Sequence, residues 1–316
     1  MNLQEETRKG YTISAQIKEV WAVQMEMARY LFSVCDKYGL KIWAEGGTLL
    51  GTIREKGYIP WDDDMDFVML RDDYDKLIAV ADKEFKSPYH LQSFGRDKLF
   101  YRGHAQMRCD GTTAILPTDL WRPFHQGIFI DVFVADTIPN EDTPEWRKAL
   151  ERADFLQDLL MSTTIHCGKL TSPKTYIKYL KSCFYCLIHG KKKLIKEYDD
   201  LFRQFNVEGN HRICLPAFMR ENMRKWIREK NWYREGIIMP FEDMEILVPI
   251  DYDNVLKTQY GDNYLSPVKE PSMHGNVIFD TKRDYREVQK ELRKKRRKEI
   301  IKSLIKRDHS YYFFAS

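Results

Sequence analysis

The chain has 316 residues, of which 43% are hydrophobic, 13% aromatic and 31% charged. This composition supplies enough apolar surface for the core of one large or two ordinary domains, and it excludes disordered and low-complexity proteins. No segment reaches the roughly 18 uncharged apolar residues of a membrane-spanning helix. The N-terminus carries no secretory signal, and six cysteines over this length do not form a disulfide framework. We therefore expect a reduced, soluble, cytoplasmic protein of enzyme size.

The net charge of +4 is distributed unevenly. Residues 282–307 contain 13 Lys and Arg against 4 Asp and Glu, a net charge of +9, so the rest of the chain has a net charge of −5. A neutral-to-acidic body with a basic tail is not the pattern of a nucleic-acid-binding protein, and we expect no nucleic acid partner.

Periodic apolar residues predict the elements of the first 134 residues. A helix is expected over 14–38, with Ser14 as its N-cap and Gly39 as its stop, because apolar residues recur there at steps of three and four. The following elements are expected in chain order: a short strand at 42–44, a helix over 48–56, a strand over 64–70, a helix over 72–85, and strands over 89–94 and 127–134.

The second half of the chain begins with a change of character. Residues 140–235 show helical patterns, as at 146–160 and 195–205, with lysine clusters and no strand signal, whereas 245–249 returns to strand character. An α+β fold follows, with a mixed sheet flanked by helices. The expected domains are a catalytic core of 1–139 plus 236–280, a helical insertion at 140–235, and a basic C-terminal helix and tail at 281–316.

Residues 61–70, with the sequence WDDDMDFVML, place three aspartates at alternate positions. Asp62, Asp64 and Asp66 would share one face of a strand. Three carboxylates on one face repel one another unless a cation lies among them, and oxygen ligands of this kind suit Mg²⁺ or Mn²⁺. A solvated turn is the alternative, but the apolar residues on both sides favour partial burial.

A fourth acid, Asp131, lies in the apolar strand expected over 127–134. Burying that carboxylate without a partner would be costly, and a metal ion shared with Asp64 and Asp66 would supply the partner. The alternative is an edge-strand aspartate in water. Two roles stay open for Asp131, because it could accept a proton from an attacking hydroxyl or only bind the metal.

Gly46, Gly47 and Thr48 open a helix directly after a strand. The backbone N–H groups at such a helix start attract phosphate, since no side chain obstructs them. A glycine pair followed at this distance by Asp-x-Asp therefore predicts a site for a phosphate-containing substrate next to the metal.

Together these motifs resemble the polymerase-β-like nucleotidyltransferases and, more narrowly, the LicD family. The resemblance rests on GTLLGTIREKGYIPWDDDMD at 47–66, with further matches at 107–112, 127–133 and, loosely, 260–267. It implies transfer of a phospho-substituent, typically phosphocholine from CDP-choline or a related CDP-linked donor, with release of CMP. The acceptor would be a sugar hydroxyl of a lipopolysaccharide, teichoic acid or capsule, or of a lipid-linked precursor.

The resemblance also implies roles for individual residues. Metal binding falls on the four aspartates already named, and catalysis on Asp64, Asp66 and Asp131. Contact with the donor phosphates falls on Arg54 and Arg108, although Met107 stands where the family commonly has Lys.

A choline headgroup would be held by aromatic rings, because a quaternary ammonium binds π faces. Candidates for the headgroup or for acid–base work are Trp61, Tyr58, Trp121 and His274. His104 and His125 are further acid–base candidates, although a lone histidine is more often structural.

Two other functions fit the same motifs. One is a nucleotidyltransferase that releases pyrophosphate, and the other is a non-enzymatic, membrane-associated scaffold of the same fold. The complete set of acids favours an enzyme over the scaffold.

We also expect contact with an anionic membrane surface. The basic helix at 282–307 carries a thin apolar stripe and is followed by aromatic residues at 311–314, and segment 169–196 has a similar character. This favours a peripheral location on the inner face of the membrane, and the alternative is a solvated charge run or a nucleic-acid-binding tail. Cys183 and Cys186 have metal-type spacing, but without a second cysteine pair a core or membrane-facing helix is favoured over zinc.

Overall fold

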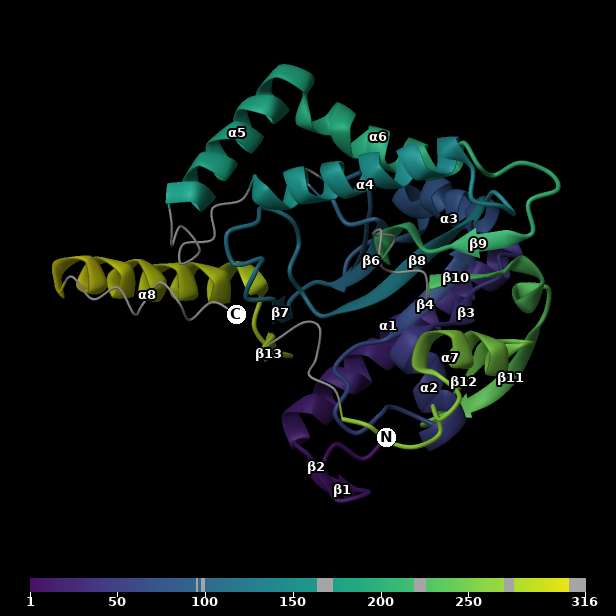
Figure 1. The fold of residues 1–316 in the computed structure, drawn as a ribbon. Coiled ribbons are helices and arrows are strands. Elements are labelled where there is room, and N and C mark those ends of the chain that lie inside the picture. The colour runs from purple at the N-terminus through teal and green to yellow at the C-terminus, as the bar shows by residue number, and fades with distance from the viewer. Residues whose placement is uncertain (95, 98–99, 164–172, 219–225, 270–275, 307–316) are drawn as a thin grey trace.

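The computed structural model describes residues 1–316 except 95, 98–99, 164–172, 219–225, 270–275 and 307–316. Figure 1 shows a twisted sheet with α4 and α6 above it, α1 and α2 below it, and α8 projecting from one side. The helices are α1 (Ala15–Tyr38), α2 (Gly46–Glu55), α3 (Arg71–Glu84), α4 (Pro144–Ser162), α5 (Pro173–His189), α6 (Lys191–Arg203), α7 (Tyr252–Tyr260) and α8 (Tyr285–Lys306). The arrangement confirms the α+β fold expected from the sequence.

The described residues form one main sheet of seven strands and three strand pairs. The main sheet contains β3 (Trp43–Ala44), β4 (Asp66–Leu70), β5 (Tyr89–Gln92), β6 (His104–Cys109), β8 (Phe129–Ile138), β9 (Arg212–Cys214) and β10 (Ile227–Glu229). The pairs are β1 (Glu6–Arg8) with β2 (Tyr11–Ile13), β7 (Thr113–Ile115) with β13 (Ile278–Asp280), and β11 (Gly236–Phe241) with β12 (Met244–Pro249).

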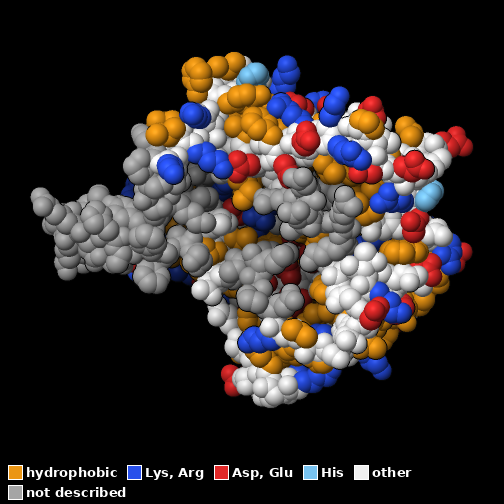
Figure 2. All heavy atoms as spheres, viewed as in Figure 1, with side chains coloured by type: hydrophobic (Ala, Val, Ile, Leu, Met, Phe, Trp, Pro, Cys, Tyr) orange, Lys and Arg blue, Asp and Glu red, His pale blue; other side chains and the backbone are white. Residues whose placement is uncertain are grey.

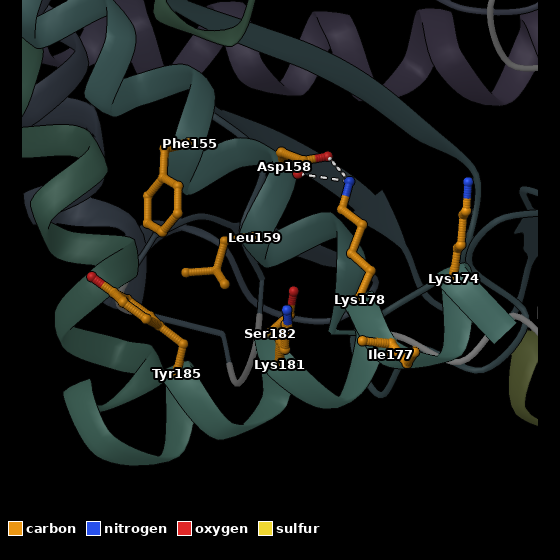
Figure 3. Close-up of a pocket in the computed structure, with 9 residues that line it drawn as sticks. All are labelled: Phe155, Asp158, Leu159, Lys174, Ile177, Lys178, Lys181, Ser182 and Tyr185. Atoms are coloured by element: carbon orange, nitrogen blue, oxygen red, sulfur yellow. Dashed lines mark hydrogen bonds and ion pairs between the residues drawn. The ribbon is translucent and has the colours of Figure 1, made fainter.

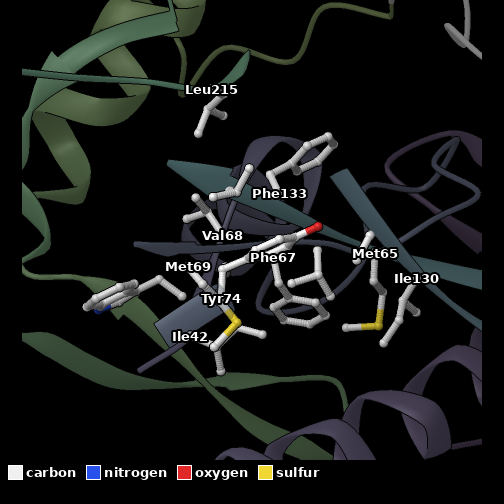
Figure 4. Packing of buried hydrophobic residues seen from close by; sticks show 14 of the residues in the cluster. Ile42, Met65, Phe67, Val68, Met69, Tyr74, Ile130, Phe133 and Leu215 are labelled. Carbon is white, nitrogen blue, oxygen red and sulfur yellow. The ribbon is translucent and has the colours of Figure 1, made fainter. Parts of the chain in front are cut away.

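Strand β8 is the centre of the main sheet. It pairs in parallel with β4 on one edge, and on the other edge it pairs antiparallel with β6 and then with β9. All ten of its residues are buried, which explains why this strand reads as an almost continuous apolar run. Val68 of β4 lies in register with Phe133 of β8, and Figure 4 shows these two side chains on one face of the sheet. Phe67 lies on the opposite face, where its ring contacts Phe32 of α1 at 5.1 Å.

The long helix expected over 14–38 is confirmed as α1. Ser14 accepts a hydrogen bond from the N–H of Ile17, and Gly39 ends the helix in the left-handed region at a φ of 62°. Its apolar stripe, including Trp21 and Leu31, is fully buried beneath the sheet. The expected helix at 48–56 begins two residues earlier, at Gly46.

The stretch 140–235 is only partly as expected. Helices α4 to α6 confirm its helical character between residues 144 and 203. The expectation of no strand is wrong, because β9 pairs with β8 and β10 pairs with β9 in the main sheet. Each of these strands has three residues, which is too short for an alternating pattern to emerge from the sequence.

The expected basic C-terminal helix is α8, and it is anchored at its start. Tyr285 is buried against the ring of His125, and the N–H of Tyr285 donates to the carbonyl of Thr112. The aromatic residues at 311–314 lie outside the described part. In the described part of the chain, no helix is both long enough and apolar enough to cross a membrane.

Cys183 and Cys186 lie on α5 as free thiols, half-buried and buried respectively. Among the described residues, neither belongs to a group of three or more side chains that could hold a metal ion. The structure thus gives no support to zinc at this pair.

Candidate metal and nucleotide site

The parallel pairing of β4 and β8 brings the predicted acids together. Asp66 is the first residue of β4 and lies in register with Asp131 on β8. Carboxylate oxygens of Asp64, Asp66 and Asp131 lie within 4.8 Å of one another, and Asp62, Asp63 and Asp64 form a second such group. Because Asp64 belongs to both groups, the four predicted acids and Asp63 form one acidic cluster.

Burial makes this cluster costly without a cation. Asp131 and Asp64 are 3% and 9% exposed. Burial, followed by the charges of Asp64, Asp131 and Asp62, raises the pKa of Asp66 well above its usual range. A divalent cation among these oxygens would reverse the repulsion, and hard carboxylate ligands fit Mg²⁺ or Mn²⁺.

The start of α2 lies against the same carboxylates. Gly46 adopts a φ of 53°, and a Cβ placed there would lie 2.8 Å from Asp66 Oδ2. A Cβ at Gly47 would lie 2.3 Å from Asp62 Oδ2. Both glycines are therefore needed for the positive end of the helix to approach the acidic cluster this closely.

The side chain of Thr48 is buried against strand β4 and does not face solvent. Its hydroxyl accepts a hydrogen bond of 2.8 Å from the N–H of Asp66, and its side chain is 3% exposed. The N–H of Glu45 donates to the carbonyl of Asp66 at 2.9 Å. These two bonds fix the first residue of β4 relative to the start of α2.

Asp131 is held by side chains from β6. Gln106 Nε2 donates to Asp131 Oδ1 at 2.6 Å, and His104 Nε2 lies 3.3 Å from the same oxygen. Arg108 donates to Gln106 Oε1 at 2.5 Å and to the carbonyl of Gly127 at 2.9 Å. A chain of contacts thus runs from Arg108 through Gln106 to the acidic cluster.

This position does not support the expected contact of Arg108 with donor phosphate. Its side chain is fully buried and lies over the ring of Phe129 at 4.6 Å. Burial and the charge of Arg102, opposed by Asp131 and Asp119, lower the pKa of Arg108 to about 9. The arginine that resembles a phosphate ligand in the sequence instead orients Gln106.

The other predicted basic residue, Arg54, lies on α2. It follows Gly47 by seven residues and so shares a helix face with it. Its side chain is 5% exposed, donates to Glu55 Oε1 at 2.8 Å and lies over the ring of Trp61 at 5.9 Å.

The histidine candidates differ in their distance from the acidic cluster and in their hydrogen bonds. His104 lies beside Asp131. His125 accepts the N–H of Gly127 at Nδ1 (3.0 Å) and donates from Nε2 to Asp110 (2.9 Å), so both ring nitrogens are engaged. Burial, opposed by Asp110, lowers the pKa of His125 to about 4, and the ring is a neutral structural element. His274 lies outside the described residues.

The aromatic candidates also separate. Tyr58 is 2% exposed and stacks on Trp21 at 4.3 Å, so it is a core residue and a headgroup contact by it is not supported. Trp121 lies beneath Arg293 and Arg297 of α8, at 5.4 and 5.3 Å. Trp61, half-buried and next to the acidic cluster in sequence, is the remaining candidate.

Two residues near the acids were not predicted as site residues. Burial, followed by the charges of Asp62 and Asp66, raises the pKa of Tyr260, the last residue of α7. Arg102 is bonded to Asp119, and the charges of Asp119 and Asp131 raise its pKa although burial lowers it. Tyr260 begins a loosely matching family segment, whereas no sequence signal marks Arg102.

A buried ion pair between Arg228 and Glu45 holds the residue that precedes α2. Arg228 on β10 donates through both terminal nitrogens to the two carboxylate oxygens of Glu45, each at 2.6 Å, and both side chains are 1% exposed. Arg228 also donates to Gln259 on α7 at 3.0 Å. Glu45 directly precedes Gly46, so this pair ties the glycine turn to β10 and α7.

Comparison with known proteins gives a consistent result. The profile of the LicD/FKTN/FKRP nucleotidyltransferase domain matches residues 39–150. The chain is 34% identical over 125 residues to the lipopolysaccharide cholinephosphotransferase LicD of Haemophilus influenzae, covering 40% of this chain and 46% of that protein. It is 44% identical over 100 residues to the human ribitol 5-phosphate transferase FKRP, covering 32% of this chain and 20% of that protein.

The matched regions therefore span less than half the length of these curated relatives. Residues 39–150, which the profile matches, contain α2, β4, β8 and the segment between α2 and β4, and these carry the acidic cluster. The profile of the LicD/FKTN/FKRP nucleotidyltransferase domain thus matches the part of the chain that carries the acidic cluster.

Proposed function

We propose that the protein is a metal-dependent phosphotransferase. It would move a phospho-substituent, phosphocholine before others, from a CDP-linked donor to a sugar hydroxyl of a cell-surface glycan or its lipid-linked precursor. The observation that carries this proposal is the convergence of Asp64, Asp66 and Asp131 within 4.8 Å, in the region that matches this profile. The names of two relatives, which transfer cholinephosphate and ribitol 5-phosphate, support the type of reaction.

The proposed reaction is a substitution at phosphorus. The sugar oxygen forms a bond to the phosphorus that carries the headgroup, the bond from that phosphorus to the CMP oxygen breaks, and CMP leaves. A divalent metal held by Asp64, Asp66 and Asp131, with Asp62 beside them, would neutralise charge on the donor phosphates. The start of α2 at Gly46 adds backbone N–H groups on the same side.

The hydroxyl proton needs an acceptor at the same place. Asp131 is hydrogen bonded by Gln106 and lies 3.3 Å from His104 Nε2. We propose that Asp131 takes this proton, with His104 as the neighbouring group that stabilises it, since a positioned acid–base pair of this kind assists proton transfer.

Arg54 is the proposed contact to the donor phosphates. An arginine presents a planar fork that matches two phosphate oxygens, and lysine does not reproduce it. We expect Arg54→Lys to lower kcat/KM for the nucleotide donor at least ~10-fold, the effect of losing one charge-assisted hydrogen bond. Steady-state kinetics with varied donor concentration measure this.

The matched control is Arg29→Lys, at an exposed arginine of α1 paired with Glu26. Equal kinetic constants for Arg54→Lys and wild type would show that Arg54 has a structural role and does not contact the donor.

The identity of the leaving group tests the whole proposal. Purified protein with Mg²⁺ is first screened by thermal melting against CDP-choline, CDP-ethanolamine, CDP-glycerol and CDP-ribitol, because a ligand that binds only the folded state raises Tm. We expect one of them to stabilise the protein and to release CMP when an acceptor glycan is added. Pyrophosphate release from CTP would instead identify a nucleotidyltransferase, and the absence of both binding and turnover would favour a scaffold.

The proposed place of action is the inner face of a membrane. A lipid-linked glycan acceptor would be held there, and the basic residues of 282–307 favour an anionic surface.

A further inference from the structure

Helix α5 exposes apolar side chains along its outer face. Ile177, Leu180, Phe184 and Leu187 follow one another at steps of three and four residues, so they form one stripe. Their exposed fractions are 51%, 47%, 64% and 80%. The opposite face of α5, with Ser182 and Cys186, is buried.

This stripe is unusual for the surface of a water-soluble helix, whose outer face is normally polar. The neighbouring Ile188 is 62% exposed, and Phe155 and Met161 of α4 are 43% and 45% exposed. Figure 2 shows hydrophobic side chains gathered beside basic ones over α5. A contiguous exposed apolar patch of this kind marks an interaction surface.

The charges around the stripe are of one sign. Residues 169–193 contain seven lysines and no acidic residue. Lys174, Lys178 and Lys181 are exposed on α5, and only Lys178 among these three has an acidic partner in the described structure, the exposed Asp158 of α4 at 2.8 Å. A second copy of the chain would bring like charges together, whereas an anionic surface would be attracted.

A groove between α4 and α5 combines both features. It has a volume of about 470 Å³, and Figure 3 shows Phe155, Leu159 and Tyr185 along its apolar part with the lysines of α5 beside them. An apolar floor with ammonium groups at its edge matches a lipid, whose phosphate lies above its acyl chains.

The apolar side of the first half of α8, by contrast, already packs against the body of the protein. Val288 is buried and Leu292 half-buried, so the apolar stripe expected from the sequence faces the protein there. Arg293 donates to the carbonyl of Leu120 at 2.7 Å, and both Arg293 and Arg297 lie over Trp121.

We propose that α5 is the docking surface of this protein for an anionic lipid bilayer. Its apolar stripe lies in the headgroup boundary, and Lys174, Lys178 and Lys181 contact lipid phosphates. The inference deepens the proposed membrane location and is independent of the proposed chemistry.

The test is flotation of the full-length protein with vesicles of phosphatidylcholine, alone or mixed with phosphatidylglycerol. We expect binding to the mixed vesicles that weakens as salt increases. The apolar variant Leu180→Gln/Phe184→Gln/Leu187→Gln and the charge variant Lys174→Gln/Lys178→Gln/Lys181→Gln should each bind at least ~10-fold more weakly. All six positions are exposed, and a thermal melt of each variant verifies folding.

The matched control is Lys290→Gln/Lys294→Gln/Lys295→Gln, which removes the same charge from exposed positions of α8. Its binding should fall less than that of either α5 variant, since those lysines lie off the apolar stripe. Loss of binding in this control but not in the α5 variants would overturn the proposal in favour of α8. A native mass that falls from dimer to monomer only in the apolar variant would show that α5 instead contacts a second copy of the chain. Absence of vesicle binding by the wild-type protein would contradict membrane docking altogether.

Failure of this inference is distinguishable from failure of the proposed function. CMP release with a water-soluble acceptor sugar does not require a membrane, so the α5 variants should keep it. Variants that lose vesicle binding but release CMP normally support both proposals, and vesicle binding without CMP release supports the docking surface alone.

Discussion

Asp66→Asn is expected to lower turnover at least ~100-fold, the scale of losing one main electrostatic contributor in an active site. Asn keeps the shape of the side chain but removes its charge. Asp66 lies in register with Asp131, and its carboxylate oxygens are within 4.8 Å of those of Asp64 and Asp131. A cation bound among these oxygens would therefore lose one of its three shared carboxylates.

The same substitution should not destabilise the metal-free protein. Asp66 is surrounded by Asp64, Asp131 and Asp62, whose charges oppose its ionised form. Removing one charge relieves this repulsion, so Tm without metal should be equal to or higher than that of wild type. The increase of Tm on adding Mg²⁺ should be lost, because the ion no longer has its ligand set.

Thermal melting with and without Mg²⁺, together with turnover, measures both effects. Asp142→Asn, at an exposed aspartate paired with Arg147 before α4, is the matched control and should change neither. Near-normal turnover by folded Asp66→Asn would contradict the catalytic assignment. A normal Mg²⁺ shift in an inactive variant would place the metal elsewhere.

The parts of the fold and site that follow from the sequence are those with a long local pattern. The 3.6-residue period of α1 fixes its buried face and both ends. The alternation of Asp62, Asp64 and Asp66, next to apolar residues, is sufficient to group them with Asp131 once the strands are taken as neighbours. Helix α1 contains its whole signal, whereas the strand expected over 64–70 begins only at Asp66, so Asp62 and Asp64 reach the cluster from the segment before β4 and not from a shared strand face.

The parts that do not follow depend on contacts between distant segments. Strands β9 and β10 have three residues each and exist because β8 offers them an edge. Strand β6 is buried at all six positions although it contains His104, Gln106 and Arg108. Arg108 is bonded to Gln106 and Gln106 to Asp131, while His104 Nε2 lies 3.3 Å from Asp131 Oδ1. No local sequence pattern reveals these contacts.

The buried pair of Glu45 and Arg228 is such a contact, and it gives the largest expected effect on stability. We expect Arg228→Met to lower the free energy of unfolding by about 3–5 kcal/mol, because it leaves the carboxylate of Glu45 buried without its cation. The double variant Glu45→Gln/Arg228→Met should recover part of this loss, since no charge is then left buried. Denaturant unfolding measures both, and additive losses would show that the two side chains do not act as a pair.

Mg²⁺ affinity distinguishes a role of this ion pair in positioning the site from a role in overall stability. Glu45 directly precedes Gly46, so Arg228→Met should also weaken Mg²⁺ binding, measured by calorimetry where the variant is fully folded. Arg71→Met is the matched control, since Arg71 and Asp136 form a buried pair (Nε to Oδ1, 2.7 Å) beyond the opposite end of β4. It should lose comparable stability but keep Mg²⁺ affinity. If both variants bind Mg²⁺ equally, the Glu45–Arg228 pair stabilises the fold without positioning the start of α2 at the acidic cluster.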